Sequence, residues 1–321
     1  MILATMAVCR NYAGSPFAIR SGFFPLRLVR IRSVRSEFFI LAALALGEST
    51  LPAQDALSTQ TLPQVARQAS KFWQAASGYY CRETLHQKAL IFPKPKLRIG
   101  RKATEAVKPE FKDREIISYY ALGSFRSTPE ALHEFRQVLQ VNGKPVMPEA
   151  KALQRFRAIL DSKDDRARTE LQEDFDQANL AVAATDFGQL ILLFTKANLE
   201  KYIFERDSSA LIGADRAIVI KFHQNAGQEA FRIGEPGKQV KQPLSGKLWV
   251  RESDNQPLRI TLTSSRQLES DEIRDEASVD YAPTAAGAVL PASVVYRRYI
   301  NNEMKVENVS QYSDWQPVNV K

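Results

Sequence analysis

The sequence predicts an α+β domain in which an antiparallel sheet packs against helices. Two observations predict this fold class. Short runs with alternating apolar residues, which are typical of strands, occupy the chain from residue 79 to 146 and again from 202 to 315. Between these parts, apolar residues recur three or four positions apart over residues 149–200, which indicates a helical block. Because mostly short turns separate the strands, we expect an antiparallel meander.

The composition is that of a folded protein with a sizeable core. Of 321 residues, 44% are hydrophobic and 25% are charged, which is ordinary for a globular chain. The formal net charge is +8, and half of it lies in the first 53 residues. The remaining surplus forms no dense basic stripe, so we expect no nucleic-acid partner. Mild basicity is compatible with peripheral contact with an anionic membrane.

The N-terminus has the order of a secretory signal. Four arginines between positions 27 and 35 precede a nine-residue apolar run over 38–46, and a small residue, Ala53, then offers a cleavage point. The run is shorter than the ~20 residues that span a bilayer. We therefore expect a signal segment over 1–53, a periplasmic or extracellular location, and a mature protein without a transmembrane span. The long stretch before the run indicates that residues 1–25 precede the true start. An uncleaved buried helix is the alternative.

Residues 62–317 are predicted to form a single domain after a flexible mature N-terminus over 54–61. Its first element is a helix over 62–76, in which apolar side chains recur on one face. Pro63 suits the first turn of this helix, and Gly78 ends it.

Two strands and a hairpin are predicted next. The strands cover 79–89 and 115–122, and a basic stretch that contains two prolines separates them. The hairpin is centred on Asn142-Gly143, which follows the apolar run Phe135–Val141 and precedes Lys144–Val146. This dipeptide favours a type I′ turn, because both central positions of that turn need positive φ.

The helical block over 149–200 has two parts. The charged part, 149–178, carries Phe156 and Phe175 at helical spacing, and the following part, 180–202, is richer in apolar residues. We expect both parts to be helical and to pack on the sheet. A helix that lies on a lipid surface is the alternative.

The C-terminal third returns to strands with turns between them. A turn is expected at Ser253–Gln256. The predicted strands are 202–208, 217–223, 230–233, 246–252, 257–264, 277–282, 290–299 and 305–315.

Sequence motifs for catalysis or metal binding are not found. The three histidines, His86, His133 and His223, have none of the spacings of zinc sites. The chain contains no nucleophile elbow, no phosphate-binding loop and no dinucleotide-binding glycine motif. We therefore predict a protein that is not an enzyme, with no catalytic residues, no metal site and no cofactor.

One cysteine remains after the predicted cleavage. Cys81 lies in a strand-like stretch, so no disulfide within the mature chain is possible. A buried thiol in the core is expected. A disulfide to another chain is the alternative, because an unpaired cysteine in an exported protein can pair outward.

A hairpin motif in the C-terminal third resembles that of a known superfamily. The segment Gly246–Arg259 (GKLWVRESDNQPLR) is similar to a hairpin of the periplasmic lipoprotein-carrier superfamily, which includes outer-membrane lipoprotein carriers and sigma-factor regulatory sensors. Arg251 stands where that pattern usually has Asp, and Asn255 stands where it usually has Gly. Further segments resemble exported bacterial proteins of unassigned function, namely Gly78–Thr84, Val138–Val146, Val279–Tyr281, Leu290-Pro291 and Tyr312–Asp314.

The resemblance implies an open half-barrel of antiparallel strands with helices on its concave side. Such a sheet leaves an apolar face that helices or a ligand must cover. Possible partners are therefore a lipid or a lipoprotein, and the alternative is an envelope protein bound by a sensor or scaffold domain. A filled core, in which the same residues pack onto the helices and leave no cavity, is the alternative. The candidate residues for lining an apolar ligand are Tyr119, Phe125, Leu190, Phe194, Trp249 and Tyr296.

Overall fold

The structure is a computed structural model that describes residues 57–91, 108–180, 187–227, 231–233 and 240–318. The predicted signal segment over 1–53 and the stretch 1–25 lie outside the described residues, as do residues 54–56 of the predicted mature N-terminus. Residues Leu57–Thr61 form a short π-helix, η1, that leads into the first α-helix.

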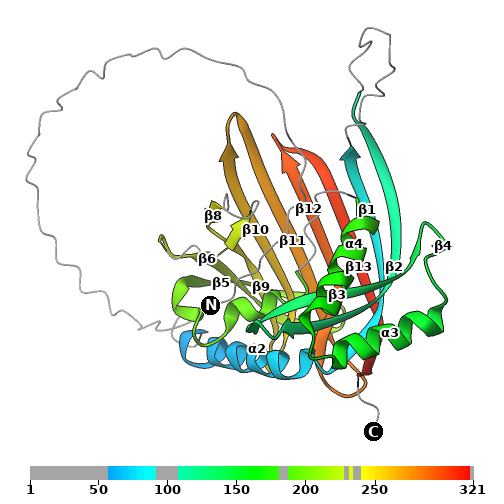
Figure 1. Ribbon diagram of the computed structural model, residues 1–321. Coiled ribbons are helices and arrows are strands. Elements are labelled where there is room, and N and C mark those ends of the chain that lie inside the picture. Colours follow the sequence, from blue (N-terminus) through cyan, green and yellow to red (C-terminus); the bar gives the residue numbers. More distant parts are fainter. Residues whose placement is uncertain (1–56, 92–107, 181–186, 228–230, 234–239, 319–321) are drawn as a thin grey trace, which may run out of the picture.

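The core of the molecule is an eleven-stranded antiparallel sheet (Figure 1). Its spatial order is β4-β3-β2-β1-β13-β12-β11-β10-β9-β6-β5, so most strands neighbour the next one in the chain. The strands are β1 (Tyr79–Ile91), β2 (Glu110–Phe125), β3 (Thr128–Val141), β4 (Lys144–Pro145), β5 (Tyr202–Ile212), β6 (Asp215–Gln224), β9 (Ser245–Arg251), β10 (Pro257–Leu268), β11 (Asp271–Pro283), β12 (Val289–Ile300) and β13 (Glu303–Pro317). Strands β7 (Phe231–Ile233) and β8 (Val240–Gln242) pair separately.

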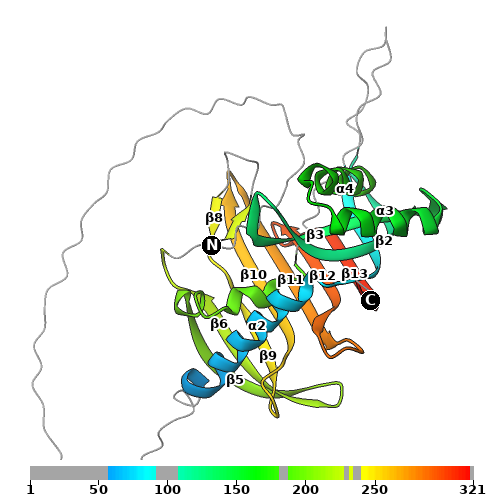
Figure 2. The same cartoon turned by 60° about the horizontal axis from the view of Figure 1, so that its bottom comes forward.

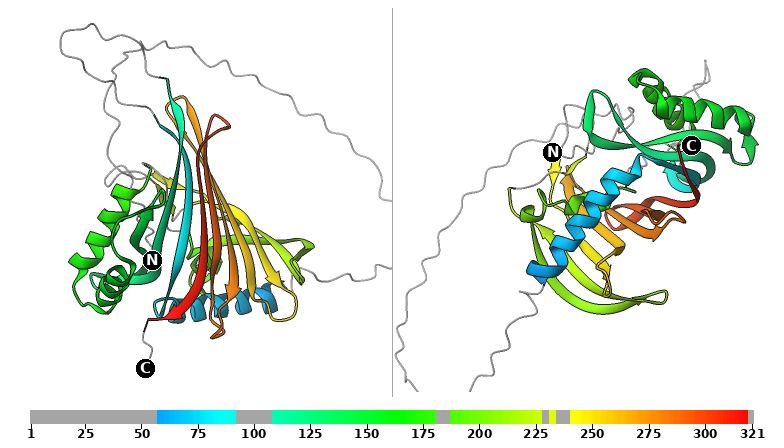
Figure 3. Two further views of the ribbon diagram at one scale, coloured as in Figure 1. Left: turned by 90° about the vertical axis from the view of Figure 1, so that its right-hand side faces the viewer. Right: turned by 90° about the horizontal axis from the view of Figure 1, so that it is seen from below.

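The sheet is strongly curved and does not close on itself (Figure 3). β4 and β5 lie at its two ends, and β13, the last strand, pairs with both β1 and β12. The predicted fold class, an α+β domain built on an open antiparallel half-barrel, is therefore confirmed.

Three α-helices in the described part of the chain accompany the sheet. Helix α2 (Leu62–Ala76) crosses the concave side, as Figures 2 and 3 show. Helices α3 (Glu149–Asp161) and α4 (Asp165–Ala178) pack against β2 and β3. None of the described helices is long and apolar enough to cross a membrane.

The chain between α4 and β5 differs from the helix expected over 180–202. The described part contains only two short 3-10 helices, η2 (Leu190–Phe194) and η3 (Leu199–Lys201). Four of the five η2 side chains are buried, so apolar residues face several directions at once. An apolar run of this kind carries no periodicity that distinguishes a helix from an irregular buried segment.

Two turns adopt the backbone that their sequences predict. Asn142 and Gly143 have φ of 50° and 72°, as a type I′ turn requires, and Asn142 Oδ1 accepts a hydrogen bond of 2.9 Å from the backbone N–H of Glu115. Asn255, in the expected turn between β9 and β10, has φ of 56°.

Strand alternation separates an apolar concave face from a polar convex face. On β9, Leu248 and Val250 are fully buried in the central cluster, whereas Trp249 between them points to the convex side. The convex face carries ion pairs between neighbouring strands, among them Arg259–Asp280 and Arg297–Glu307. The concave face is therefore the part of the sheet that needs a cover.

Candidate functional site on the concave face

The floor of the candidate site is the apolar concave face itself. Strands from β1 to β13 contribute buried side chains to one continuous cluster. The main contributors are Tyr120, Leu122, Ile220, Phe222, Leu248, Val250, Ile260, Leu262, Ala277, Val279, Tyr281, Val294, Tyr296, Val306 and Tyr312.

Helix α2 covers part of this floor through apolar packing. Val65, Ala69, Phe72 and Ala76 are buried along one face of the helix. The ring of Phe72 meets that of Tyr281 edge-on, with 6.2 Å between the centroids. Apolar contact of this kind has no directional requirement, so another apolar group can replace it.

A second cover, the segment from Phe187 to Phe194, is tied to the floor by hydrogen bonds. The Gly188 N–H donates to Glu134 Oε1 over 2.7 Å. The Tyr281 hydroxyl accepts from the Ile191 N–H at 3.0 Å and donates to the Gly188 carbonyl at 3.1 Å. These directional bonds fix the segment in place, in contrast to α2.

Beneath this segment lies a buried cluster of charged side chains. Arg136 donates to both oxygens of Glu83, at 2.7 and 3.1 Å, and to Glu134 at 2.5 Å. The Ser118 hydroxyl also donates to Glu83. One guanidinium therefore faces two carboxylates, and these three side chains together carry a formal charge of −1. We name this group the acidic cluster.

Aromatic and thiol groups surround the acidic cluster. The rings of Tyr120 and Tyr312 lie 4.6 Å apart, and Arg136 lies over the ring of Tyr120 at 5.0 Å. Burial raises the pKa of both hydroxyls well above the ordinary tyrosine value, and the nearby carboxylates raise it further. Burial likewise raises the pKa of the Cys81 thiol, which lies in the core. These groups are uncharged at neutral pH and act as packing and hydrogen-bonding groups.

A second charged cluster lies farther along the same face. Asp275 Oδ1 accepts from the Tyr296 hydroxyl at 2.6 Å and from Arg298 Nε at 2.7 Å, and Oδ2 lies 3.4 Å from Arg266 Nη1. Here two guanidiniums face one carboxylate, so Asp275, Arg266 and Arg298 together carry a formal charge of +1. We name these three residues the basic cluster. Burial lowers the pKa of Arg266, because a charged group in a partly dry environment loses hydration.

Comparison with known proteins gives alignments with solved structures and shows no family. No family model matches the chain, and no curated protein matches it. A domain from Vibrio parahaemolyticus described as outer-membrane lipoprotein-sorting aligns with a TM-score of 0.32 and 7% identity over 80% of this chain and 92% of its own. A LolA superfamily protein from Nitrosomonas europaea aligns with a TM-score of 0.29 and 9% identity over 81% and 95%. A DUF1329 family protein from Desulfovibrio piger aligns with a TM-score of 0.32 and 10% identity over 81% and 94%.

The structure brings three of the six predicted lining residues together. Leu190, Phe194 and Tyr296 are buried in the same cluster as α2. Tyr296 also stacks on Phe187 of the second cover, with 5.0 Å between the ring centroids. Leu190 and Phe194 belong to the second cover and Tyr296 to β12, and all three side chains are buried.

The other three predicted residues lie elsewhere. Tyr119 stacks on Phe156 of α3 with 6.2 Å between centroids, and its hydroxyl donates to Glu149. Phe125 packs edge-on against Phe135. Phe135 and Phe156 belong to a separate apolar cluster, against which Tyr119 and Phe125 pack. Trp249 is half-buried on the convex face.

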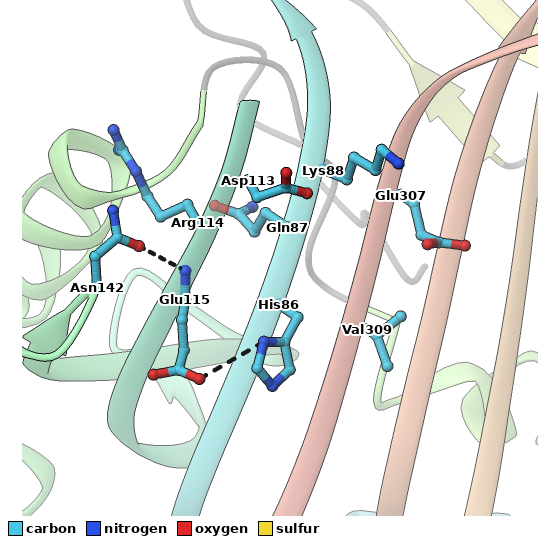
Figure 4. Close-up of a pocket in the computed structure, with 9 residues that line it drawn as sticks. All are labelled: His86, Gln87, Lys88, Asp113, Arg114, Glu115, Asn142, Glu307 and Val309. Carbon is cyan, nitrogen blue, oxygen red and sulfur yellow. Dashed lines mark hydrogen bonds and ion pairs between the residues drawn. The ribbon is translucent and has the colours of Figure 1, made fainter. Parts of the chain in front are cut away.

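Two surface hollows of about 350 Å³ each are lined by described residues outside the covered face. The first has charged walls from β1, β2 and β13, and there His86 Nδ1 lies 3.7 Å from Glu115 Oε2 (Figure 4). The second lies beside Tyr312 and Trp315 of β13, next to the turn between β11 and β12. In the described part of the chain, no group of three metal-ligating side chains occurs.

Neither charged cluster was predicted from the sequence. Their partners are far apart in the chain: Glu83 and Arg136 are 53 residues apart, and Asp275 and Arg298 are 23 apart. The available signal was a pair of charges, Glu134 and Arg136, at alternate positions between the apolar residues Leu132 and Val138.

Proposed function

We propose that this protein is a non-enzymatic, exported protein of the cell envelope that binds a lipid, a lipoprotein or another apolar ligand on the concave face. The observation that carries the proposal is the contrast between the two covers. The segment with Gly188 is hydrogen-bonded to the floor, whereas α2 meets the floor through apolar side chains. An acyl chain can replace the apolar contacts of α2 with apolar contacts of its own.

The energetic requirement for this exchange is modest. A buried methylene contributes about 0.8 kcal/mol, so about ten methylenes contribute on the order of 8 kcal/mol before ordering costs. A ligand of that size can compensate for the apolar area that α2 loses when it moves aside. In this proposal Leu190, Phe194 and Tyr296 line the ligand, and Phe72 is displaced.

The position of Trp73 on α2 provides a direct test. Trp73 packs against the central cluster, whereas Trp249 lies on the convex face. In the double variant Trp249→Phe, Trp315→Phe, Trp73 is the sole tryptophan, and palmitate is titrated while its fluorescence and the thermal unfolding midpoint are followed. We expect a saturable change in emission and a higher midpoint, because a ligand that binds the folded state stabilises it.

A filled core predicts a different result. If saturating palmitate and phospholipid change neither signal, the concave face is not a binding site and the proposal fails. The remaining candidate is then an interaction domain whose ligand is another polypeptide. The exposed edge strand β5 favours that candidate, since Leu211 is 71% exposed there. However, a bulge between Arg206 and Ser208 interrupts the edge.

A further inference from the structure

We infer that the ligand of the concave face is an amphiphile with an anionic head group, and that this head group binds to Arg266 and Arg298. The inference rests on the proposed function and specifies the class of ligand. It follows from the charge of the basic cluster, its degree of burial and its position relative to the apolar floor.

The basic cluster holds more positive charge than its own carboxylate balances. Both ion pairs that the structure describes for Arg266 and Arg298 go to Asp275. One oxygen of Asp275 is shared between Arg298 and the Tyr296 hydroxyl, and the other accepts a long contact of 3.4 Å from Arg266. A carboxylate or phosphate would complete the pairing, because guanidinium groups bind both oxyanions with paired hydrogen bonds.

The cluster is buried enough to make this charge matter. The side chains of Arg266 and Arg298 are 14% and 10% exposed, and that of Asp275 is 3% exposed. Water screens such groups only partly, so a surplus charge there is costly and a bound counter-charge is favourable. The remaining exposure leaves the guanidiniums accessible to a ligand.

The apolar floor begins directly beside the basic cluster. On β11, Asp275 is followed on the same face by Ala277, Val279 and Tyr281, all buried. From Asp275 to Tyr281 the strand extends for about 20 Å at about 3.3 Å per residue. One acyl chain extends through about half of the ~30 Å hydrocarbon core of a bilayer. The length of β11 between Asp275 and Tyr281 exceeds this depth. A chain whose head group lies at the basic cluster therefore reaches the part of the floor that Phe72 of α2 covers.

The acidic cluster gives the ligand a direction. Glu83, Glu134 and Arg136 carry a formal charge of −1 at the end of the floor near Tyr120 and Tyr312. An anionic head group would be repelled there and attracted to Arg266 and Arg298. The two clusters therefore favour the same orientation of the ligand.

The test compares two sixteen-carbon probes, one with an anionic head group and one with an uncharged head group. Palmitate and its uncharged analogue hexadecanol are titrated into the purified protein, and into the variants Arg266→Gln and Arg274→Gln. Arg266→Gln leaves the Arg298–Asp275 pair in place. Arg274→Gln is the matched control, because Arg274 pairs with Glu276 on the convex face. We expect Arg266→Gln to weaken palmitate binding about tenfold, which is about 1.4 kcal/mol, with hexadecanol affinity unchanged and Arg274→Gln without effect. Arg266→Lys should restore part of the affinity lost in Arg266→Gln, because lysine returns the charge without the paired hydrogen bonds.

Each other outcome overturns a defined part of the argument. Failure of both probes to bind overturns the proposed function. Equal affinity for palmitate and hexadecanol in the unmodified protein overturns the head-group inference alone, and this comparison needs no variant to fold. If inorganic phosphate alone raises the unfolding midpoint and displaces palmitate at similar concentrations, the basic cluster binds a small free anion. The inference that the ligand is an amphiphile is then wrong.

Discussion

At the scale of single residues, Arg136 is the most constrained side chain of the concave face. It forms ion pairs with two buried carboxylates and stacks over two rings, those of Tyr120 and Phe175. A buried ion pair is weak evidence for net stability, yet removing one partner leaves an uncompensated charge in a dry environment. The acidic cluster therefore behaves as a unit in which each member depends on the others.

We predict that Arg136→Met lowers the free energy of unfolding by about 3–5 kcal/mol, because Glu83 and Glu134 lose their counter-charge. Urea denaturation followed by circular dichroism measures the loss. Arg82→Met is the matched control: Arg82 pairs with Glu149 at 2.6 Å on the surface, where such pairs contribute about 0–1 kcal/mol. Similar losses in both variants would contradict a special role for the buried cluster.

Alkaline pH is predicted to destabilise the fold through Tyr202. Burial raises the pKa of this hydroxyl to about 12, whereas it is about 10 in an unfolded chain. The folded state therefore holds the proton more tightly, so the stabilisation is complete below pH ~10 and is lost as the pH rises from about 10 to about 12. The change is about 3 kcal/mol for this group. Unfolding free energies measured across this range should fall less steeply in Tyr202→Phe. An unchanged slope would show that Tyr202 does not titrate as its burial implies.

At the scale of elements, the sequence predicted most strands to within a few residues, because alternation follows burial on one face of the sheet. The sequence did not predict the ends of strands where backbone pairing continues beyond the apolar residues. β2 begins at Glu110 rather than at 115, since its exposed, charged start pairs with the end of β1. β3 begins at Thr128 rather than at 135. Backbone hydrogen bonds hold these extensions, and the side-chain pattern does not record them.

Strands β9 and β10 approach each other closely at Gly246. A Cβ atom at this position would lie 2.0 Å from the Thr261 carbonyl oxygen and 2.9 Å from Cζ of Phe222. We predict that Gly246→Ala costs about 3 kcal/mol, because the two strands must separate or the ring of Phe222 must move. Chemical denaturation measures the cost. Ser245→Ala, at an exposed neighbouring position, should change the free energy of unfolding by no more than about 0.5 kcal/mol. An equally small effect of Gly246→Ala would show that the two strands separate at little cost.

At the scale of the whole molecule, the fold class was predictable and the candidate site only in part. Leu190, Phe194 and Tyr296 were identified because apolar runs and strand aromatics usually face a core. The face that Trp249 occupies was not predictable, since alternation gives relative and not absolute orientation. The charged clusters were hidden for a different reason: their members meet only when distant strands pair.

Export remains a prediction at this scale. Intact-mass analysis of the protein isolated from the envelope or the medium should give a chain that starts close to Gln54, because the small residue Ala53 follows the apolar run. Full-length protein retained in the cytosol would contradict it.

The position of β13 between β1 and β12 has a consequence for how the chain acquires its structure. Among the described strands β13 is synthesised last, and of these strands it alone joins the part of the sheet made of β1–β4 to the part made of β5, β6 and β9–β12. Tyr79 and its partner Pro317 lie at opposite ends of the described chain, so this pairing closes a very long loop and folding is expected to be slow. When the chain leaves a ribosome or a translocation channel from its N-terminus, the two parts of the sheet therefore emerge first. They stay unjoined, with exposed edges, until β13 emerges. Premature termination before Glu303 would leave them permanently apart, and a chaperone that shields those edges would have its greatest effect in that interval.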